Sequence, residues 1–184
     1  NTLSSDGTVA LSTIALAEDG RTMVYGTSGS GSDWQEFRVR DVATAQDRSD
    51  HLKWIKFSGA AWTHDGAGFF YSRYPEPGAG ADPLLDVNRN QKVYYHRLGT
   101  DQSADRLIYE RPDHPDWGFS VEVSADGRYA VYTVWLGTDS RNRVYYPDLG
   151  EARKPKLEAP GARLLDAFDG ASGVIGNVWP LFYI

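Results

Sequence analysis

The chain has 184 residues, a formal net charge of −6, 13% aromatic residues and no cysteine. An acidic chain without a run of Lys or Arg is not expected to bind nucleic acid, which needs a basic surface. The lack of cysteine excludes disulfides, thiolate metal sites and a cysteine nucleophile. The sequence shows no apolar run of membrane-spanning length and no basic-then-apolar signal pattern, so we expect no membrane partner either.

A strand–turn–strand pattern occurs three times and organises the chain. It is clearest at 121–133, where alternating apolar residues flank Asp126-Gly127. The same form surrounds Asp19-Gly20 and Asp65-Gly66. An Asp-Gly dipeptide between two alternating segments predicts a tight two-residue hairpin turn of the primed type, because glycine adopts positive φ without strain.

Two further elements repeat in the same order. The segment VYYHRLG at 93–99 matches VYYPDLG at 144–150, and the segment at 105–111 matches the one at 162–168. A unit of roughly 45–60 residues that holds four short strands is typical of a propeller blade. The alternative is a plain β-sandwich in which the Asp-Gly turns recur by chance.

The repeats divide the chain into blades at about 8–55, 59–110 and 119–168, with the start of another at 172–184. The predicted strands are 8–16, 22–27, 34–42, 51–55, 59–63, 68–73, 92–98, 106–110, 119–123, 128–134, 143–148 and 163–168. In the last unit, Asn177-Val178-Trp179-Pro180 stands where an Asp-Gly turn is expected. The predicted fold is therefore all-β, a partial propeller of three to three and a half four-stranded antiparallel blades, without a substantial helix.

Connectivity predicts where a binding site would lie. Each inner strand leads into an Asp-Gly turn and the next strand returns antiparallel, so all these turns lie at one end of the propeller. The opposite end collects the loops at 28–33, 57–59, 74–91, 117–119 and 135–141. Function concentrates where loops cluster on one face of a rigid scaffold, so this loop end is the expected site.

Two glycine- or aspartate-rich segments resemble ligand loops without meeting their requirements. The segment Gly26–Gly31 lacks the lysine of a phosphate-binding loop and is not followed by a predicted helix. The segment Asp86–Asn90 begins like a calcium loop, but Gln91 and Arg97 stand where glycine and a bidentate glutamate are needed. We therefore expect no metal site and no cofactor.

The residues also show no catalytic constellation. The segment Gly170-Ala-Ser-Gly-Val only approaches the G-x-S-x-G elbow of serine hydrolases. Paired carboxylates at a shared buried site are not indicated, because most aspartates stand in turns. The histidines have no ligand spacing and are expected at the surface or at strand edges: His51, His64, His96 and His114.

Longer blocks of the sequence are similar to the β-propeller of the prolyl oligopeptidase family. These blocks are Gly29–Trp34 (GSGSDW), Val39, Ile55–Tyr71 (IKFSGAAWTHDGAGFFY), Gln91–Asp105 (QKVYYHRLGTDQSAD) and Ser124–Tyr132 (SADGRYAVY). The resemblance covers roughly residues 5–184. It implies a part of a seven-bladed propeller, closed without strand exchange, that caps an α/β-hydrolase domain with a Ser-Asp-His triad.

In that family the enzyme cleaves short peptides after proline, and the propeller restricts access to the site. The resemblance therefore implies a substrate-gating portion of a serine peptidase. Its partners would be the hydrolase domain of the same protein and proline-containing oligopeptides. The triad is not in this chain, so the chain alone is expected to be inactive. A cytoplasmic location is expected, with the periplasm as the alternative.

The resemblance also implies five rim residues that face the active site. Asp33 matches an acidic position before a tryptophan, and Phe57 matches the phenylalanine of the KFS segment. Thr138 stands where some members have cysteine, Gly118 where others have a methionine near the proline pocket, and Trp135 where others have arginine. The alternatives are an Asx turn for Asp33 and packing between blades for Phe57.

A rival hypothesis is a stand-alone propeller-like binding or scaffold module without catalytic activity. The sequence begins inside a polar turn and ends in a strand, so we expect a fragment of a longer protein. A parent sequence with a serine elbow followed by Asp and His would favour the peptidase. Further Asp-Gly repeats and nothing else would favour the scaffold.

Overall fold

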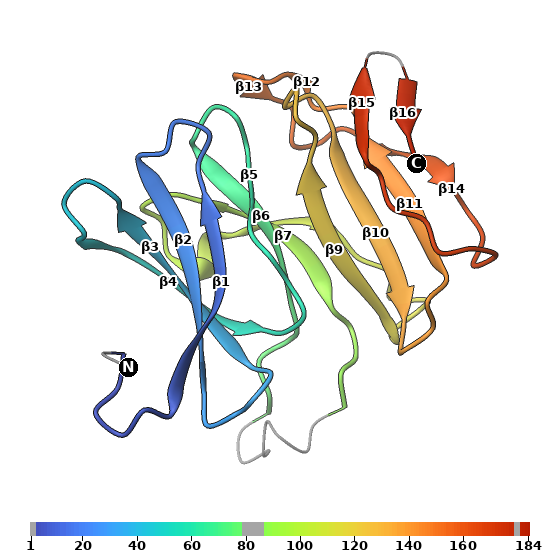
Figure 1. The fold of residues 1–184 in the computed structure, drawn as a ribbon. Coiled ribbons are helices and arrows are strands. Elements are labelled where there is room, and N and C mark those ends of the chain that lie inside the picture. Colours follow the sequence, from blue (N-terminus) through green and yellow to red (C-terminus); the bar gives the residue numbers. More distant parts are fainter. Residues whose placement is uncertain (1–2, 79–86, 179–180) are drawn as a thin grey trace.

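The computed structural model describes residues 3–78, 87–178 and 181–184, which form antiparallel β-sheets (Figure 1). The first sheet contains β1 (Val9–Leu16), β2 (Thr22–Gly29), β3 (Gln35–Asp41) and β4 (Asp47–Ile55). The second contains β5 (Ala61–Trp62), β6 (Gly68–Arg73), β7 (Lys92–Arg97) and β8 (Arg106–Tyr109). The third contains β9 (Trp117–Val123), β10 (Ala130–Leu136), β11 (Asn142–Pro147) and β14 (Gly161–Leu165). Four-stranded antiparallel sheets in chain order confirm the all-β prediction.

Two small hairpins complete the described strands. The pair β12 (Gly150–Glu151) and β13 (Lys154–Pro155) stands between β11 and β14, and β15 (Gly176–Val178) pairs with β16 (Leu181–Tyr183) after the third sheet. Within the described ranges, the single helical piece is the short 3-10 helix Gln102–Ala104. The predicted turn residues Trp179 and Pro180 lie outside the described residues, as do 79–86 of the loop at 74–91, including Asp86 of the calcium-like segment.

The Asp-Gly hairpins are not the two-residue primed turns that the sequence predicted. A primed type I turn needs positive φ at both central residues, but only the glycines have it, with φ of 68°, 69° and 71° at Gly20, Gly66 and Gly127. In the first hairpin the Ala17 N–H donates to the Thr22 carbonyl, which closes a longer loop. The aspartate carboxylate accepts from the backbone N–H two residues ahead, at 2.9 Å for Asp19 and Arg21. Aspartate therefore stabilises a wider turn through its side chain.

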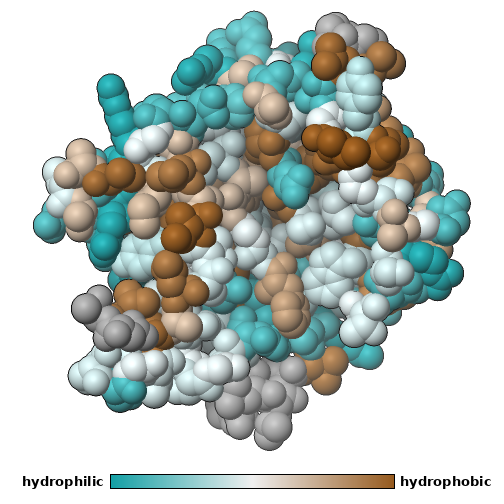
Figure 2. Space-filling model, viewed as in Figure 1, coloured by the Kyte–Doolittle hydropathy of each residue, from teal (hydrophilic) through white to brown (hydrophobic). Residues whose placement is uncertain are grey.

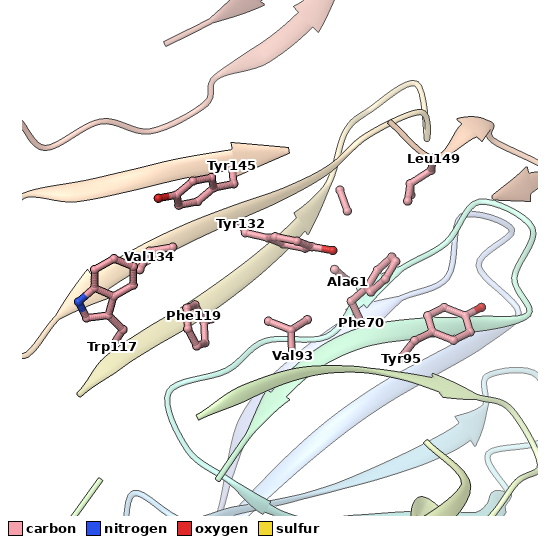
Figure 3. Packing of buried hydrophobic residues seen from close by; sticks show 11 residues of the cluster. Ala61, Phe70, Val93, Tyr95, Trp117, Phe119, Tyr132, Val134, Tyr145 and Leu149 are labelled. Atoms are coloured by element: carbon pink, nitrogen blue, oxygen red, sulfur yellow. The ribbon is translucent and has the colours of Figure 1, made fainter. Parts of the chain in front are cut away.

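Two apolar cores lie between neighbouring sheets. The first is made by Val24, Phe37 and Leu52 of the first sheet against Phe69 and Tyr71 of β6. In the second, side chains of β9 and β10 face those of β6 and β7 (Figure 3). Its labelled members are Ala61, Phe70, Val93, Tyr95, Trp117, Phe119, Tyr132, Val134, Tyr145 and Leu149. Each sheet thus packs face to face on the next, and β1, β5 and β9 line one groove.

A buried polar cluster joins the first two sheets. His96 of β7 lies between Asp50 of β4 and Asp105, with Nε2 2.9 Å from Asp50 Oδ1 and Nδ1 2.6 Å from Asp105 Oδ1. All three side chains are fully buried. The Tyr71 hydroxyl donates to Asp105 at 2.6 Å, and the Gly99 N–H donates to Asp50. Both ring nitrogens face carboxyl oxygens, so the imidazolium form of His96 can donate a hydrogen bond to each of the two aspartates.

The pKa of His96 follows from these contacts. Burial by itself lowers the pKa of His96, but the hydrogen bonds to Asp105 and Asp50 and their negative charges outweigh it, so its pKa lies above the ordinary value. The prediction of a surface or strand-edge histidine was therefore wrong for His96, and the sequence did not indicate the two carboxylates that share its buried site. His96 and Asp50 are 46 residues apart in sequence, so no local spacing could indicate the pair.

Apolar side chains remain exposed at both ends of the row of sheets. Figure 2 shows hydrophobic residues over β1 on the left and over the C-terminal hairpin at the upper right. On β1, Ile14 and Leu16 are 59% and 56% exposed, and on the hairpin Val178 and Leu181 are 65% and 60% exposed. Phe182 packs against Tyr129 and Tyr146 and attaches the hairpin to the third sheet.

These surfaces predict that the 184-residue chain associates with itself when it is produced alone. Exposed apolar patches and open sheet faces favour association, so we expect dimers or larger species by size-exclusion chromatography with light scattering. Replacing Ile14 and Leu16 by lysine should shift the population toward the monomer. A monodisperse wild-type monomer with one cooperative unfolding transition would contradict this prediction.

Candidate functional site

Strained backbone positions gather at the end of the sheets opposite the Asp-Gly turns. Among the described residues, five non-glycine residues have positive φ, and four of them stand in or beside the loops of this end. These are Ser30, Trp54, Phe57 and Asn90, with φ of 53°, 62°, 57° and 60°. Such a conformation costs about 1–3 kcal/mol per residue and persists only where the surroundings enforce it. Strain of this kind often marks a functional site, which makes this end the candidate.

The segment after β4 is held by contacts with the second sheet. The Tyr74 N–H donates to the Trp54 carbonyl at 3.0 Å, and the Ser72 N–H donates to the Ser58 hydroxyl at 2.8 Å. Phe57 lies between these two attachments in the left-handed conformation. The loop is therefore fixed on both sides of Phe57, and its ring is presented to solvent with 45% of the residue exposed.

Phe57 meets Trp135 of β10 across the two sheets. Their ring centroids are 5.9 Å apart at an interplanar angle of 85°, an edge-to-face contact. Trp135 pairs with Gly118 in the β9–β10 register, and its indole lies directly over that glycine. A Cβ atom on Gly118 would be only 2.0 Å from the Trp135 indole, so the glycine makes room for the ring. The structure thus brings three of the five expected rim residues together.

Asp33 reaches this group through a residue that the sequence prediction missed. Lys56 Nζ lies 3.8 Å from Asp33 Oδ2, and the side chain of Asp33 is 65% exposed while that of Lys56 is 13% exposed. The same ammonium group lies 5.2 Å from the Trp34 ring centroid and 5.3 Å from that of Phe57. Lys56 thus places a positive charge between the acidic and the aromatic parts of the rim, as its position directly before Phe57 could have indicated.

Aromatic rings form the wall behind Lys56. Trp34 contacts Trp54 and Tyr74 edge to face, with centroid distances of 6.1 and 6.0 Å. Burial raises the pKa of Tyr74 to about 12, so its hydroxyl stays protonated and uncharged. The fifth expected residue, Thr138, is exposed in the turn after β10, and none of the described contacts joins it to the other four.

The rim combines an aromatic pair with one carboxylate and one ammonium group. Within the described part of the chain, no group of three or more His, Cys, Asp or Glu side chains could hold a metal ion. No hydrogen bond among the described residues joins a serine or threonine hydroxyl to a histidine. Among the same residues, no helix is long and apolar enough to cross a membrane. What the rim offers is an exposed aromatic edge for an apolar group and a carboxylate for a cation.

Comparison with known proteins identifies the family. Residues 1–184 match the family described as prolyl oligopeptidase, N-terminal beta-propeller domain. Prolyl oligopeptidase A of Amanita bisporigera is 36% identical over 202 residues, covering 100% of this chain and 26% of the relative. The prolyl endopeptidase of Elizabethkingia meningoseptica is 36% identical over 149 residues, covering 81% of this chain and 21% of the relative. The chain spans about a quarter of the length of these curated relatives.

Solved structures agree with this match. Prolyl oligopeptidase B of Galerina marginata, bound to a 35mer hydrolysis and macrocyclization substrate, gives a TM-score of 0.87 at 27% identity, covering 100% of this chain and 26% of that chain. A structure from a study of two prolyl endopeptidases gives a TM-score of 0.82 at 35% identity, covering 94% of this chain and 23% of that chain. The successive four-stranded sheets, the whole-chain family match and these neighbours show that the chain belongs to the N-terminal β-propeller domain of the prolyl oligopeptidase family.

Proposed function

We propose that this chain is the substrate-gating propeller portion of a serine peptidase that cleaves short peptides after proline. The observation that carries the proposal is the contact between exposed Phe57 and half-buried Trp135, whose ring lies over Gly118 at the strained loop end of the propeller. An aromatic edge held rigidly beside a carboxylate suits a peptide with an apolar side chain and a positive N-terminus. The names of the relatives, prolyl oligopeptidase and prolyl endopeptidase, support this substrate class.

In this proposal the loop end faces an α/β-hydrolase domain of the same protein, which supplies the Ser-Asp-His triad. Phe57 and Trp135 provide an apolar wall for the bound peptide, and Gly118 lets the Trp135 ring lie close to the backbone of β9. Asp33 is the acidic partner of a basic residue of the hydrolase domain or of the peptide N-terminus. Thr138 lies farther along the rim. The sheets are then consecutive blades of a seven-bladed ring, at about 8–55, 59–110 and 119–168, with another starting at 172–184.

The test is cleavage of a proline-containing octapeptide by the full-length protein and by the 184-residue chain, followed by mass spectrometry. We expect the full-length protein to cut after proline and the chain alone to be inactive. A full-length protein that binds such peptides but leaves them intact would instead favour the stand-alone binding or scaffold module.

Replacing Phe57 with alanine in the full-length protein should raise KM for this octapeptide about tenfold and change kcat by less than about twofold. The reason is that the aromatic wall would contact the peptide equally in the ground state and the transition state. Steady-state kinetics measure both constants. Val42→Ala is the matched control, because Val42 is also exposed, at 42%, but follows β3 in the turn to β4 at the opposite end. An unchanged KM in Phe57→Ala would contradict the assigned role.

A further inference from the structure

A single buried amide connects the two segments that carry the rim. Gln91 stands directly before β7 and is 2% exposed. Its Nε2 donates to the Lys56 carbonyl at 2.9 Å, and its Oε1 accepts from the Phe119 N–H at 2.6 Å. One side chain therefore satisfies a backbone acceptor after the first sheet and a backbone donor in the third.

Both bonded groups lie next to rim residues. The Lys56 carbonyl belongs to the peptide unit that leads into Phe57, and the Phe119 N–H belongs to the unit that follows Gly118. Phe57 stands on one of these segments, and the ring of Trp135 lies over the other. Any change in the distance between the Lys56 carbonyl and the Phe119 N–H therefore changes how the Phe57 and Trp135 rings meet.

The preceding residue strengthens this connection. The Asn90 N–H donates to the Pro115 carbonyl at 2.6 Å, in the stretch just before β9, and Asn90 has a φ of 60°. Strained backbone and two consecutive inter-sheet attachments thus meet at 90–91. An amide suits this place because it offers a donor and an acceptor side by side, whereas an apolar side chain would leave both backbone groups unpaired.

We propose that Gln91 is a positioning residue that sets the spacing and orientation of the Phe57–Trp135 pair and thereby the affinity of the rim for peptide. The effect on peptide rests on the function proposed above. The effect on the aromatic pair does not, since it follows from the contacts alone.

The experiment compares Gln91→Met with Gln102→Met in the full-length protein. Gln102 is the control because its amide also makes two bonds to one backbone position, Lys53, at 3.0 Å each, yet none of the described contacts joins it to the rim. Its Nε2 also donates to the Tyr71 hydroxyl at 3.1 Å, so Gln102→Met removes at least as many hydrogen bonds as Gln91→Met. Both variants lose two backbone hydrogen bonds and should unfold at a lower temperature. Only Gln91→Met is expected to raise KM for the octapeptide, by about tenfold, with kcat changed less than about twofold.

A double-mutant cycle separates positioning from general loosening. In a Phe57→Ala background, Gln91→Met should change KM by less than about twofold, because the wall that it positions has been removed. An equal change of KM in both backgrounds, or an equal change in Gln102→Met, would overturn the proposal. If Gln91→Met does not fold, Gln91→Glu keeps the acceptor for Phe119 and should raise KM by about threefold, again only when Phe57 is present.

Near-ultraviolet circular dichroism gives a readout without substrate. Gln91→Met should alter the tryptophan bands of the wild-type protein and leave them unchanged in a Trp135→Leu background. Gln91→Met could alter the tryptophan bands while Phe57→Ala leaves KM unchanged. This result would show that Gln91 positions the Phe57–Trp135 pair and that the proposed role of the pair in peptide binding is wrong. Unaltered bands in the wild-type background would overturn the inference itself.

Discussion

Replacing His96 with phenylalanine is expected to destabilise the propeller by about 3–5 kcal/mol near pH 6, because removing one partner of a buried ion pair leaves uncompensated charge. Asp50 and Asp105 would both lose the cation that faces them at 2.9 and 2.6 Å. All three side chains are fully buried, so water cannot replace the lost bonds without opening the contact between the first two sheets. Thermal and urea unfolding of the full-length protein would measure the loss.

The same cluster predicts how stability depends on pH. The pKa of His96 is raised in the folded state, so its contribution to the free energy of unfolding is fully present below the unfolded pKa of about 6.5. The contribution declines above that value and is lost as the pH rises through the folded pKa. The stability difference between wild type and His96→Phe should therefore narrow as the pH rises above about 6.5 and through the raised folded pKa of His96.

His51 provides the control for both statements. Its Nε2 lies 2.6 Å from Glu36 Oε2, but the two side chains are 30% and 45% exposed. Exposed pairs contribute about 0–1 kcal/mol, so His51→Phe should change stability by no more than that. A loss in His96→Phe as small as the loss in His51→Phe, or a difference that does not change with pH, would show that the buried histidine is not held as a cation.

Replacing Gly118 with alanine should displace the Trp135 ring and raise KM for the proline-containing octapeptide about tenfold or more, since the rim loses both aromatic contacts at once. The added Cβ would lie 2.0–2.3 Å from three atoms of the indole, so the Trp135 ring has to move. Trp135 is only half-buried, so the ring can turn outward and the fold survives. The edge-to-face contact with Phe57 is then lost, and steady-state kinetics with near-ultraviolet circular dichroism would report both changes.

Gly59→Ala is the control at the same end of the propeller. Gly59 stands two residues after Phe57, and a Cβ atom there would meet no atom within 4 Å. We expect wild-type KM and wild-type tryptophan bands for this variant. If Gly118→Ala behaves like Gly59→Ala in both measurements, the space that Gly118 leaves does not determine the position of the Trp135 ring or the KM for the peptide.

The rim could be predicted from the sequence only in part. The resemblance supplied Asp33, Phe57, Gly118, Trp135 and Thr138, and the structure joins Phe57, Trp135 and Gly118 directly. Asp33 is attached through Lys56, and Thr138 stands apart. Phe57 is 45% exposed but also contacts Trp135 of the third sheet, so both its expected role at the rim and the packing alternative stay predictions. Gln91 was missed as a rim residue because its partners, Lys56 and Phe119, are distant in sequence. Lys56 was missed although it stands directly before Phe57, because its partner Asp33 comes from the loop between β2 and β3.

The sequence by itself determined where the strands and the turns between them lie. Alternation of apolar residues and the glycine of each Asp-Gly turn act within a few residues, so they fix strands such as β6 (Gly68–Arg73), which the sequence predicted with the same bounds. What only the tertiary structure decided is which distant side chains meet. His96 becomes a buried cation because Asp50 arrives from another sheet, and Gln91 becomes a connection because Lys56 and Phe119 do. Charge and hydrogen bonding depend on distance in space, which no short sequence pattern encodes.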